Sequence, residues 1–481
     1  MIHEKGSSRA DIFSMMKTRS GKTLSENGEG VPLKTDNNND KQMNRTFYII
    51  FFSLILDLLA FTVILPLLPS LLEHYSHHDE SGLYSAIKNS VSSFRNFVGA
   101  PDTARWNSVL FGGLIGSLFS MLQFLTSPII GAASDVYGRR PLMLICLIGI
   151  SFSYVLWALS QSFLLFVIAR IFGGISKGNV SLCTAIVTDV STPQKRGKGM
   201  ALIGIAFSIG FVFGPTIGAA FSRLNREEGN SVFFVMPALF ALVLSVADFA
   251  FMYLYLSETL PSNKRLKSKR FLSQAAEYIN PLSLFRFSSV SKLSANESTA
   301  VQSIGSIYFI YLFIYSGLEF TLPFLMHNRF EYTSMQQGKM FFFIGTVMAL
   351  VQGGYTRRVT SGKEAKTAMR GILILIPSFI LMAFVTNTVL MYTALTLFSF
   401  ASATVVPCMT TLISTYGGDD EKGTIMGIFR SLGALSRAVG PVLASTVYWC
   451  FGAHVCYIMG AVFLIIPLAQ IAKQQHCSKP E

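Results

Sequence analysis

The chain has 481 residues, of which 51% are hydrophobic and only 14% charged, whereas soluble domains carry about a quarter charged residues. This composition, with its long apolar runs, excludes an ordinary soluble protein and indicates an integral membrane protein. The net charge of +13 does not indicate a nucleic-acid-binding protein, because no compact soluble segment gathers it. In membrane proteins such a surplus is typical of cytoplasmic loops.

Residues 1–46 contain no apolar core of a signal peptide, and their polar composition predicts a disordered cytoplasmic tail. Twelve later segments contain the roughly 20 apolar residues that a membrane-spanning helix needs. They are 47–72, 108–130, 141–160, 163–188, 199–221, 231–256, 302–327, 338–356, 367–386, 388–413, 423–449 and 452–472. We therefore predict an all-α membrane protein with twelve transmembrane helices in two pseudo-symmetric six-helix bundles, 47–256 and 302–472. A basic cytoplasmic linker, 257–301, joins them, and 473–481 form a short tail.

Lysine and arginine positions predict the orientation of these spans. With the N-terminus inside, 28 of the 39 basic residues fall in inside segments, six in outside loops and five within spans. Because basic residues favour cytoplasmic loops, both termini are predicted to be cytoplasmic. The six cysteines show no zinc-binding spacing, and no phosphate-binding loop occurs. We therefore expect no metal, no cofactor and no enzymatic activity, but secondary transport.

Spans five and eleven resemble each other. GIAFSIG at 204–210 aligns with GIFRSLG at 427–433 with four of seven residues identical, and KG precedes and GP follows both. A repeated unit of six spans is typical of transporters built from two parallel halves.

Two short motifs on the predicted cytoplasmic side suggest a gate. GAASDVYGRR, 131–140, joins spans two and three. Its glycines allow close approach and a left-handed turn, and its aspartate attracts arginines and helix N-termini. TDVSTPQKRGKG, 188–199, follows span four. The candidate gate residues are Gly131, Asp135, Gly138, Arg139, Arg140, Asp189 and Arg196. The alternative is that both motifs are ordinary basic turns.

Charged residues inside the spans are the candidate binding groups, since charge in hydrocarbon is costly and usually faces a cavity. Spans four and eleven each hold two cations seven residues apart, hence on nearly the same helical face. These cations are Arg170, Lys177, Arg430 and Arg437; the acids in other spans are Asp57, Asp248 and Glu319. The positive balance favours an anionic substrate. The alternative is internal pairing, for example Arg170 with Asp57 and Arg437 with Glu319.

Asp57 and Glu319 are candidate proton carriers, because a carboxyl group in a desolvated site can take and release a proton near neutral pH. GIAFSIGFVFGPTIGA, 204–219, supplies a helix for close packing, in which Gly210, Gly214 and Gly218 allow neighbouring helices to approach and Pro215 bends the helix.

These motifs resemble those of the major facilitator superfamily, including its two cytoplasmic latches, its antiporter-type fifth helix and the first helix of its tetracycline-exporter type. Val136 departs from that pattern, which usually has a basic residue after the aspartate. RIFGGISKGNVSLCTAIV, 170–187, and GIFRSLGALSRAVGPV, 427–442, resemble a vertebrate tetracycline transporter-like branch. The resemblance implies a multispecific organic anion transporter at the plasma membrane or an internal membrane such as the nuclear inner membrane.

The expected partners are therefore a small amphipathic organic anion, protons or a counter-anion, and the lipid bilayer, with the chain acting as a monomer. Two other functions remain open. The protein is a proton-coupled exporter of organic cations if Asp57 and Glu319 bind the substrate. It is a non-transporting receptor or scaffold if binding occurs on loops 73–107 or 257–301.

Overall fold

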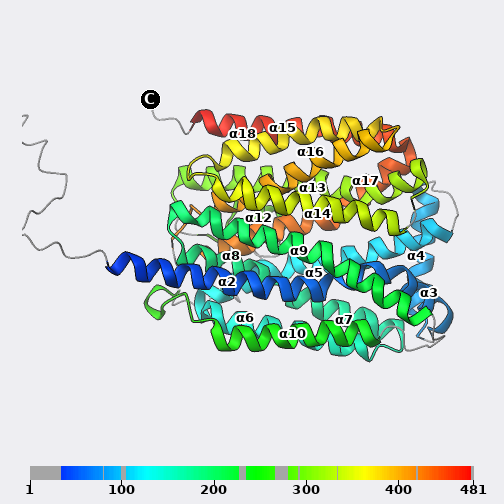
Figure 1. The fold of residues 1–481 in the computed structure, drawn as a ribbon, viewed down its shortest axis with the longest axis horizontal. Helices are drawn as coiled ribbons and strands as arrows, with labels where there is room; N and C mark the ends of the chain where they lie inside the picture. The colour runs from blue at the N-terminus through cyan, green and yellow to red at the C-terminus, as the bar shows by residue number, and fades with distance from the viewer. Residues whose placement is uncertain are drawn as a thin grey trace, which may run out of the picture. The chain divides into compact units, whose positions relative to one another are not determined.

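The computed structural model describes residues 34–79, 81–98, 104–226, 235–265, 280–290, 293–332, 334–418 and 421–477. All regular elements in these ranges are helices (Figure 1). They are α2 (Lys34–Thr62), η1 (Leu65–Leu67), α3 (Leu68–His78), α4 (Leu83–Val98), α5 (Ala104–Tyr137), α6 (Arg139–Ala158), α7 (Phe163–Ser176), α8 (Asn179–Val190), α9 (Pro193–Arg226), α10 (Val235–Tyr255), η2 (Ser262–Lys264), α12 (Pro281–Arg286), α13 (Ala295–Phe330), α14 (Ser334–Gly354), η4 (Thr356–Arg358), α15 (Glu364–Ala383), α16 (Thr388–Ile413), α17 (Lys422–Phe463) and α18 (Ile465–Cys477). Residues up to Gln42 and residues from Met43 onward are separate units, and the contacts below belong to the second.

Ten helical segments among the described residues are long and apolar enough to cross a membrane, which confirms a multi-pass all-α membrane protein. The predicted spans 338–356 and 423–449 are also helical, within α14 and α17, but they are not among the ten. Polar residues lower the mean hydropathy of these two segments, because α14 begins SMQQGK and α17 carries two arginines. The count of twelve stays a prediction.

Several helices extend beyond the predicted spans. Helix α2 begins at Lys34, inside the predicted tail, and the predicted loop 73–107 contains α4. The sequence search looked for continuous apolar runs, whereas α4 is amphipathic, with apolar residues at helical spacing. The linker 257–301 likewise contains α12. An apolar run identifies only the part of a helix that can face lipid, whereas the backbone hydrogen bonds of the same helix extend beyond the run.

The predicted spans eleven and twelve meet at Gly452. Span eleven lies in α17, and span twelve comprises the rest of α17 and most of α18. The backbone at Gly452 is non-helical, with φ 81° and ψ 170°, a region that glycine reaches without strain. The chain folds back at this glycine, because Cys456 Sγ donates to Ala444 O at 3.4 Å across it. The turn predicted between residues 449 and 452 is therefore made at a single glycine.

Two hydrophobic clusters form the core. One contains residues between Met43 and Leu256, and the other residues between Leu284 and Ile471 together with Phe124 and Ala185. The N-terminal and C-terminal halves also meet where α5 packs against α17 and where α9 packs against α14 and α16. Figure 1 shows α9 and α14 running side by side. The charged residues considered next lie on helices at or near these contacts.

Candidate functional site

The predicted span 163–188 is broken in its middle. Helix α7 ends at Ser176 and α8 begins at Asn179. Lys177, between them, has φ −78° and ψ 34°, and its carbonyl oxygen accepts a hydrogen bond of 3.3 Å from Gln123 Nε2. The local sequence GGISKGN contains three glycines, which weaken a helix. The break therefore places a lysine in the membrane interior, together with a carbonyl group that bonds to a side chain of α5 instead of a backbone N–H.

Lys177 forms a buried ion pair with Asp57 of α2. Its Nζ lies 2.6 Å from Oδ1 and 2.7 Å from Oδ2, and the two side chains are 6% and 1% exposed. The pairing of Asp57 with Arg170, considered from the sequence as an alternative, is wrong. The reason is the helix break, since Lys177 leaves the regular face of α7 and turns toward α2.

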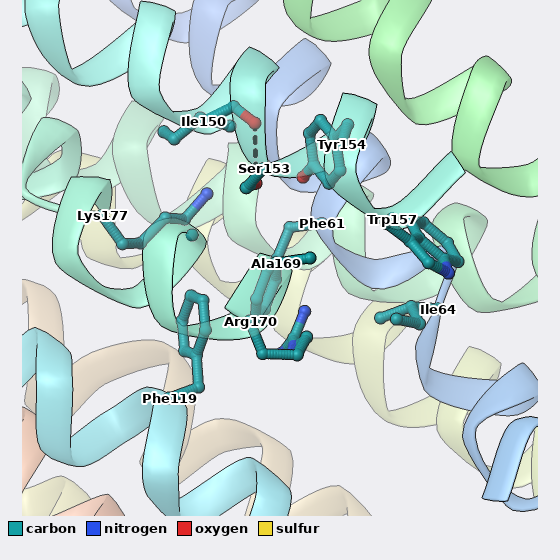
Figure 2. A pocket seen from close by; sticks show the side chains of 11 residues that line it. Phe61, Ile64, Phe119, Ile150, Ser153, Tyr154, Trp157, Ala169, Arg170 and Lys177 are labelled. Atoms are coloured by element: carbon teal, nitrogen blue, oxygen red, sulfur yellow. Dashed lines mark hydrogen bonds between the residues drawn. The ribbon is translucent and has the colours of Figure 1, made fainter. Parts of the chain in front are cut away.

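A small pocket lies beside this ion pair (Figure 2). Arg170 and Lys177 both line it, together with aromatic side chains of α2, α5 and α6. The Arg170 guanidinium lies 4.7 Å from the ring centre of Phe119 and 5.9 Å from that of Phe61, and Lys177 Nζ lies 4.9 Å from Phe61. Such cation–π contacts stabilise a cation without neutralising its charge. Within the described residues, Arg170 has no ion-pair partner.

The pocket holds about 20 Å³, enough for about one water molecule. A drug-sized ligand needs about 300 Å³ or more. In this conformation the space beside the two cations is therefore too small for a drug-sized ligand.

The C-terminal half contributes a second pair of cations from α17. The Arg430 guanidinium lies 5.3 Å from the ring centre of Phe207 on α9, so it reaches the N-terminal half. Glu319 of α13 accepts a hydrogen bond of 3.4 Å from Tyr315 and lies within electrostatic range of Arg437. No ion pair between Glu319 and Arg437 occurs in the described part of the chain, so the structure does not contain this second alternative pairing.

The predicted gate residues Asp135, Arg139 and Asp189 lie together. Arg139 is fully buried; its Nη1 lies 2.6 Å from Asp135 Oδ1 and its Nε 2.9 Å from Asp189 Oδ2. Nη1 also donates to Ser134 Oγ at 2.6 Å. Two carboxylates thus hold one arginine between the end of α5 and the end of α8.

Asp135 also binds the C-terminal half. Its Oδ1 accepts from the backbone N–H of Gly423 at 2.9 Å, and its Oδ2 from the N–H and hydroxyl of Thr424, both at 2.7 Å. These are unpaired N–H groups of the first turn of α17, where a carboxylate is favoured. The sequence identified the aspartate but not this partner, 288 residues away.

Gly131 and Asp135 lie inside α5 rather than in the predicted loop, and only Gly138 separates α5 from α6. A side chain at Gly131 would collide with the carbonyl oxygen of Gly423, so the expected close approach exists, but between two helices. Gly138 has the expected positive φ of 103°.

Glu258 completes this end of the molecule, and the sequence analysis did not select it. Its carboxylate accepts from the backbone N–H of Arg139 at 2.9 Å and of Arg140 at 3.3 Å, and lies 3.3 Å from Arg265. Arg140 donates to Tyr253 O at 2.8 Å. The available signal was the single acid in LSETLP, directly after span six.

A model of the Major Facilitator Superfamily matches residues 50–441. The chain belongs to the major facilitator superfamily. It is 46% identical over 437 residues to the mouse Major facilitator superfamily domain-containing protein 10, covering 90% of this chain and 93% of the relative. The crystal structure of the human organic anion transporter MFSD10 (TETRAN) matches with a TM-score of 0.84 and 45% identity, covering 89% of this chain and 99% of that one. Tetracycline resistance protein class B of Escherichia coli is 23% identical over 448 residues, 90% of this chain and 99% of the relative.

These matches confirm the family and the fold that the motifs indicated.

Two further residues of the predicted gate motifs have defined surroundings. Arg196 donates from Nη1 to Ser414 O at 2.7 Å, which is a second contact between the halves. Val136, where the family usually has a basic residue, is half-buried and packs beside Ala132 and Ala133.

The antiporter-type helix packs closely on α2. A side chain at Gly210 would collide with Leu58, and one at Gly214 with Thr62. Thr62 Oγ1 donates to Gly210 O at 2.8 Å. Pro215 lies within α9 and Gly218 is buried. This packing fixes the part of α2 that carries Asp57.

Proposed function

We propose that this chain is a secondary transporter of small amphipathic organic anions, working by alternating access and coupled to protons or to a counter-anion. The observation that carries the proposal is a surplus of cations within the membrane-spanning region. Four of the five basic residues in the predicted spans, Arg170, Lys177, Arg430 and Arg437, stand against three acids, Asp57, Asp248 and Glu319. The only ion pair among these seven is that of Lys177 with Asp57.

An anionic group fits this arrangement chemically. Arg170 offers a planar guanidinium with no acidic partner in the described residues, suited to a carboxylate or sulfonate. Lys177 becomes available when the anion displaces Asp57. The rings of Phe61 and Phe119 provide an apolar surface for the rest of an amphipathic molecule.

Alternating access requires the halves to move. The bonds from Asp135 to α17 and from Arg196 to Ser414 hold the halves together at the predicted cytoplasmic end. The pocket of about 20 Å³ must widen before an organic anion enters. We propose that these contacts break when the transporter opens to the cytoplasm, with both termini on that side, the chain monomeric, and the protein resident in the plasma membrane or an internal membrane.

The similarity to a human protein called an organic anion transporter supports an anionic substrate.

The test is uptake of a labelled aromatic carboxylate into proteoliposomes by wild type, Lys177→Ala and Lys366→Ala. Lys366 is an exposed lysine on α15, and its variant serves as the control. We expect saturable uptake by wild type and the control and little by Lys177→Ala. Equal uptake by all three would contradict the anion site. If Asp57→Asn alone abolished transport of an organic cation, the chain would be a cation exporter. Absence of uptake by well-folded protein would favour a scaffold.

A further inference from the structure

Asp248 of α10 is a buried carboxyl group to which the sequence analysis gave no role beyond its charge. It is 0% exposed, and among the described residues its oxygen atoms form no ion pair and no hydrogen bond of good geometry, although the hydroxyl of Ser53 is directed toward it. An ionised carboxylate in such a place is strongly destabilising unless a cation or donors compensate it.

The surroundings of Asp248 contain one cation and a second acid. Ser53 and Asp57 of α2 and Lys177 at the break after α7 act on it directly. Tyr154 of α6 and Cys183 of α8 lie within electrostatic range of Asp248. Arg170 of α7 acts on Tyr154, and Arg430 of α17 on Cys183. Lys177 directs its ammonium group to both oxygens of Asp57, so its charge is already matched. Two carboxyl groups therefore share one lysine.

We infer that Asp57, Lys177 and Asp248 form one proton-binding site, in which Asp57 is ionised and Asp248 carries the proton in this conformation. Two acids that share a site do not both ionise when only one positive charge compensates them. The geometry decides which acid keeps the proton, because Asp57 has the ammonium at 2.6 Å and Asp248 has no charged partner in contact. Loss of Lys177 from Asp57 therefore changes the proton occupancy of both carboxyl groups.

The neighbouring pocket gives this site a route for protons. Tyr154 and Lys177 line the pocket, whose volume of about 20 Å³ admits about one water molecule. Figure 2 shows both side chains beside the same space, together with Ser153. A hydronium ion in that space transfers its proton to one carboxylate: an O–H bond forms on the carboxyl group as one O–H bond of the hydronium ion breaks, which leaves a neutral water molecule.

The inference rests on the proposed function only for its role in transport, so its first test is independent of transport. Infrared spectra of the full-length protein in lipid at neutral pH report protonated carboxyl groups. We expect the wild-type spectrum to contain a band that is missing from Asp248→Asn and present in Ser245→Ala, the control one turn away on α10. We expect Asp57→Asn to lose the same band, because Lys177 is then free to pair with an ionised Asp248.

Each result of the infrared test either supports or overturns the inference that Asp248 carries the proton. A wild-type spectrum from which Asp248→Asn subtracts no carboxyl band would show that Asp248 is ionised and would overturn the inference. If Asp248→Asn does not fold, Asp57→Asn carries the test: persistence of every wild-type band would contradict a shared proton.

The second test measures the ratio of uptake with and without an inward proton gradient. We expect the gradient to accelerate wild type and to leave the rate of Asp248→Asn unchanged, whatever that rate is. An equal ratio in both proteins would contradict a role for Asp248 in coupling. Lack of saturable uptake by wild type would refute the proposed function and leave the infrared result standing.

Discussion

Lys177 contacts both carboxylate oxygens of Asp57, at 2.6 and 2.7 Å, although the two residues lie 120 positions apart and the lysine belongs to no helix. The pair joins α2 to the break between α7 and α8. Because both side chains are almost completely buried, neither charge has water to replace its partner. The pair is therefore a structural contact between α2 and the break, and under the proposed function an incoming anion would compete with Asp57 for Lys177.

Breaking this pair on one side should destabilise the protein more than removing both charges. Removal of one partner of a buried pair costs about 3–5 kcal/mol, whereas replacing both partners by apolar groups of similar size is often nearly neutral. We expect Lys177→Met to lower the melting temperature clearly and Lys177→Met with Asp57→Leu to recover most of the loss. Thermal unfolding in detergent measures both. A double variant no more stable than Lys177→Met would show that the pair does not account for the loss.

The bonds from Asp135 to α17 should favour the conformation that is closed at the gate. Asp135→Asn keeps the shape of the side chain but removes the charge that faces three donors of α17 and Arg139. Hydrogen bonds to a charged group contribute about 1.5–3 kcal/mol each. We expect a larger open population in Asp135→Asn, seen as longer distances between spin labels at Tyr137 and Thr415. Arg357→Gln, at an exposed position, is the control, and unchanged distances in Asp135→Asn would refute the latch.

The contact between α5 and α17 should tolerate no side chain at Gly131. An added methyl group meets backbone atoms of Gly423 and Gly427, which do not move aside as a flexible side chain does. We expect Gly131→Ala to lower the melting temperature and to separate the same pair of spin labels. At Gly353 of α14 the nearest atom is Ile205 Cδ1 at 3.8 Å, so Gly353→Ala should be neutral or stabilising by about 0.5–1 kcal/mol. Equal effects of the two substitutions would contradict the packing argument.

Asp79, in the segment before α4, should make the stability of the folded protein depend on pH. Desolvation is the largest single influence on its carboxyl group and raises the pKa. The hydrogen bonds from Ser81 and from the backbone N–H groups of Tyr84 and Phe163 together outweigh it, so the pKa lies below its usual value. A lowered folded-state pKa means stabilisation that is present above the unfolded pKa of about 3.9 and is lost as the pH falls through the folded pKa.

Asp79→Asn removes this contribution. We expect wild type to melt at a higher temperature than the variant at neutral pH, and the difference to shrink as the pH falls below about 4. Thermal scans of both proteins across this range measure it. A difference that stays constant over the whole range would contradict the assignment to Asp79.

The sequence predicted residues whose chemistry is local and missed partners that depend on distant geometry. The motif at 131–140 contains Asp135 and Arg139 four positions apart in one short stretch, so their pairing followed from the motif. The N-terminus of α17 and Glu258 come from elsewhere in the chain, and no local pattern links them to it. The alternative that paired Asp57 with Arg170 was wrong because helical spacing assumes a continuous helix, whereas the break after α7 gives Lys177 a direction of its own.

Asp135 has one further property that follows from its two sets of bonds. It holds Arg139 within the N-terminal half while it binds the first turn of α17. When the halves part, the carboxylate therefore keeps an arginine as its counterion, and only the amide groups of α17 have to acquire water. In the proposed opening, this arrangement leaves no buried charge without a counterion, and the energy of opening then depends mainly on how easily water reaches the exposed end of α17.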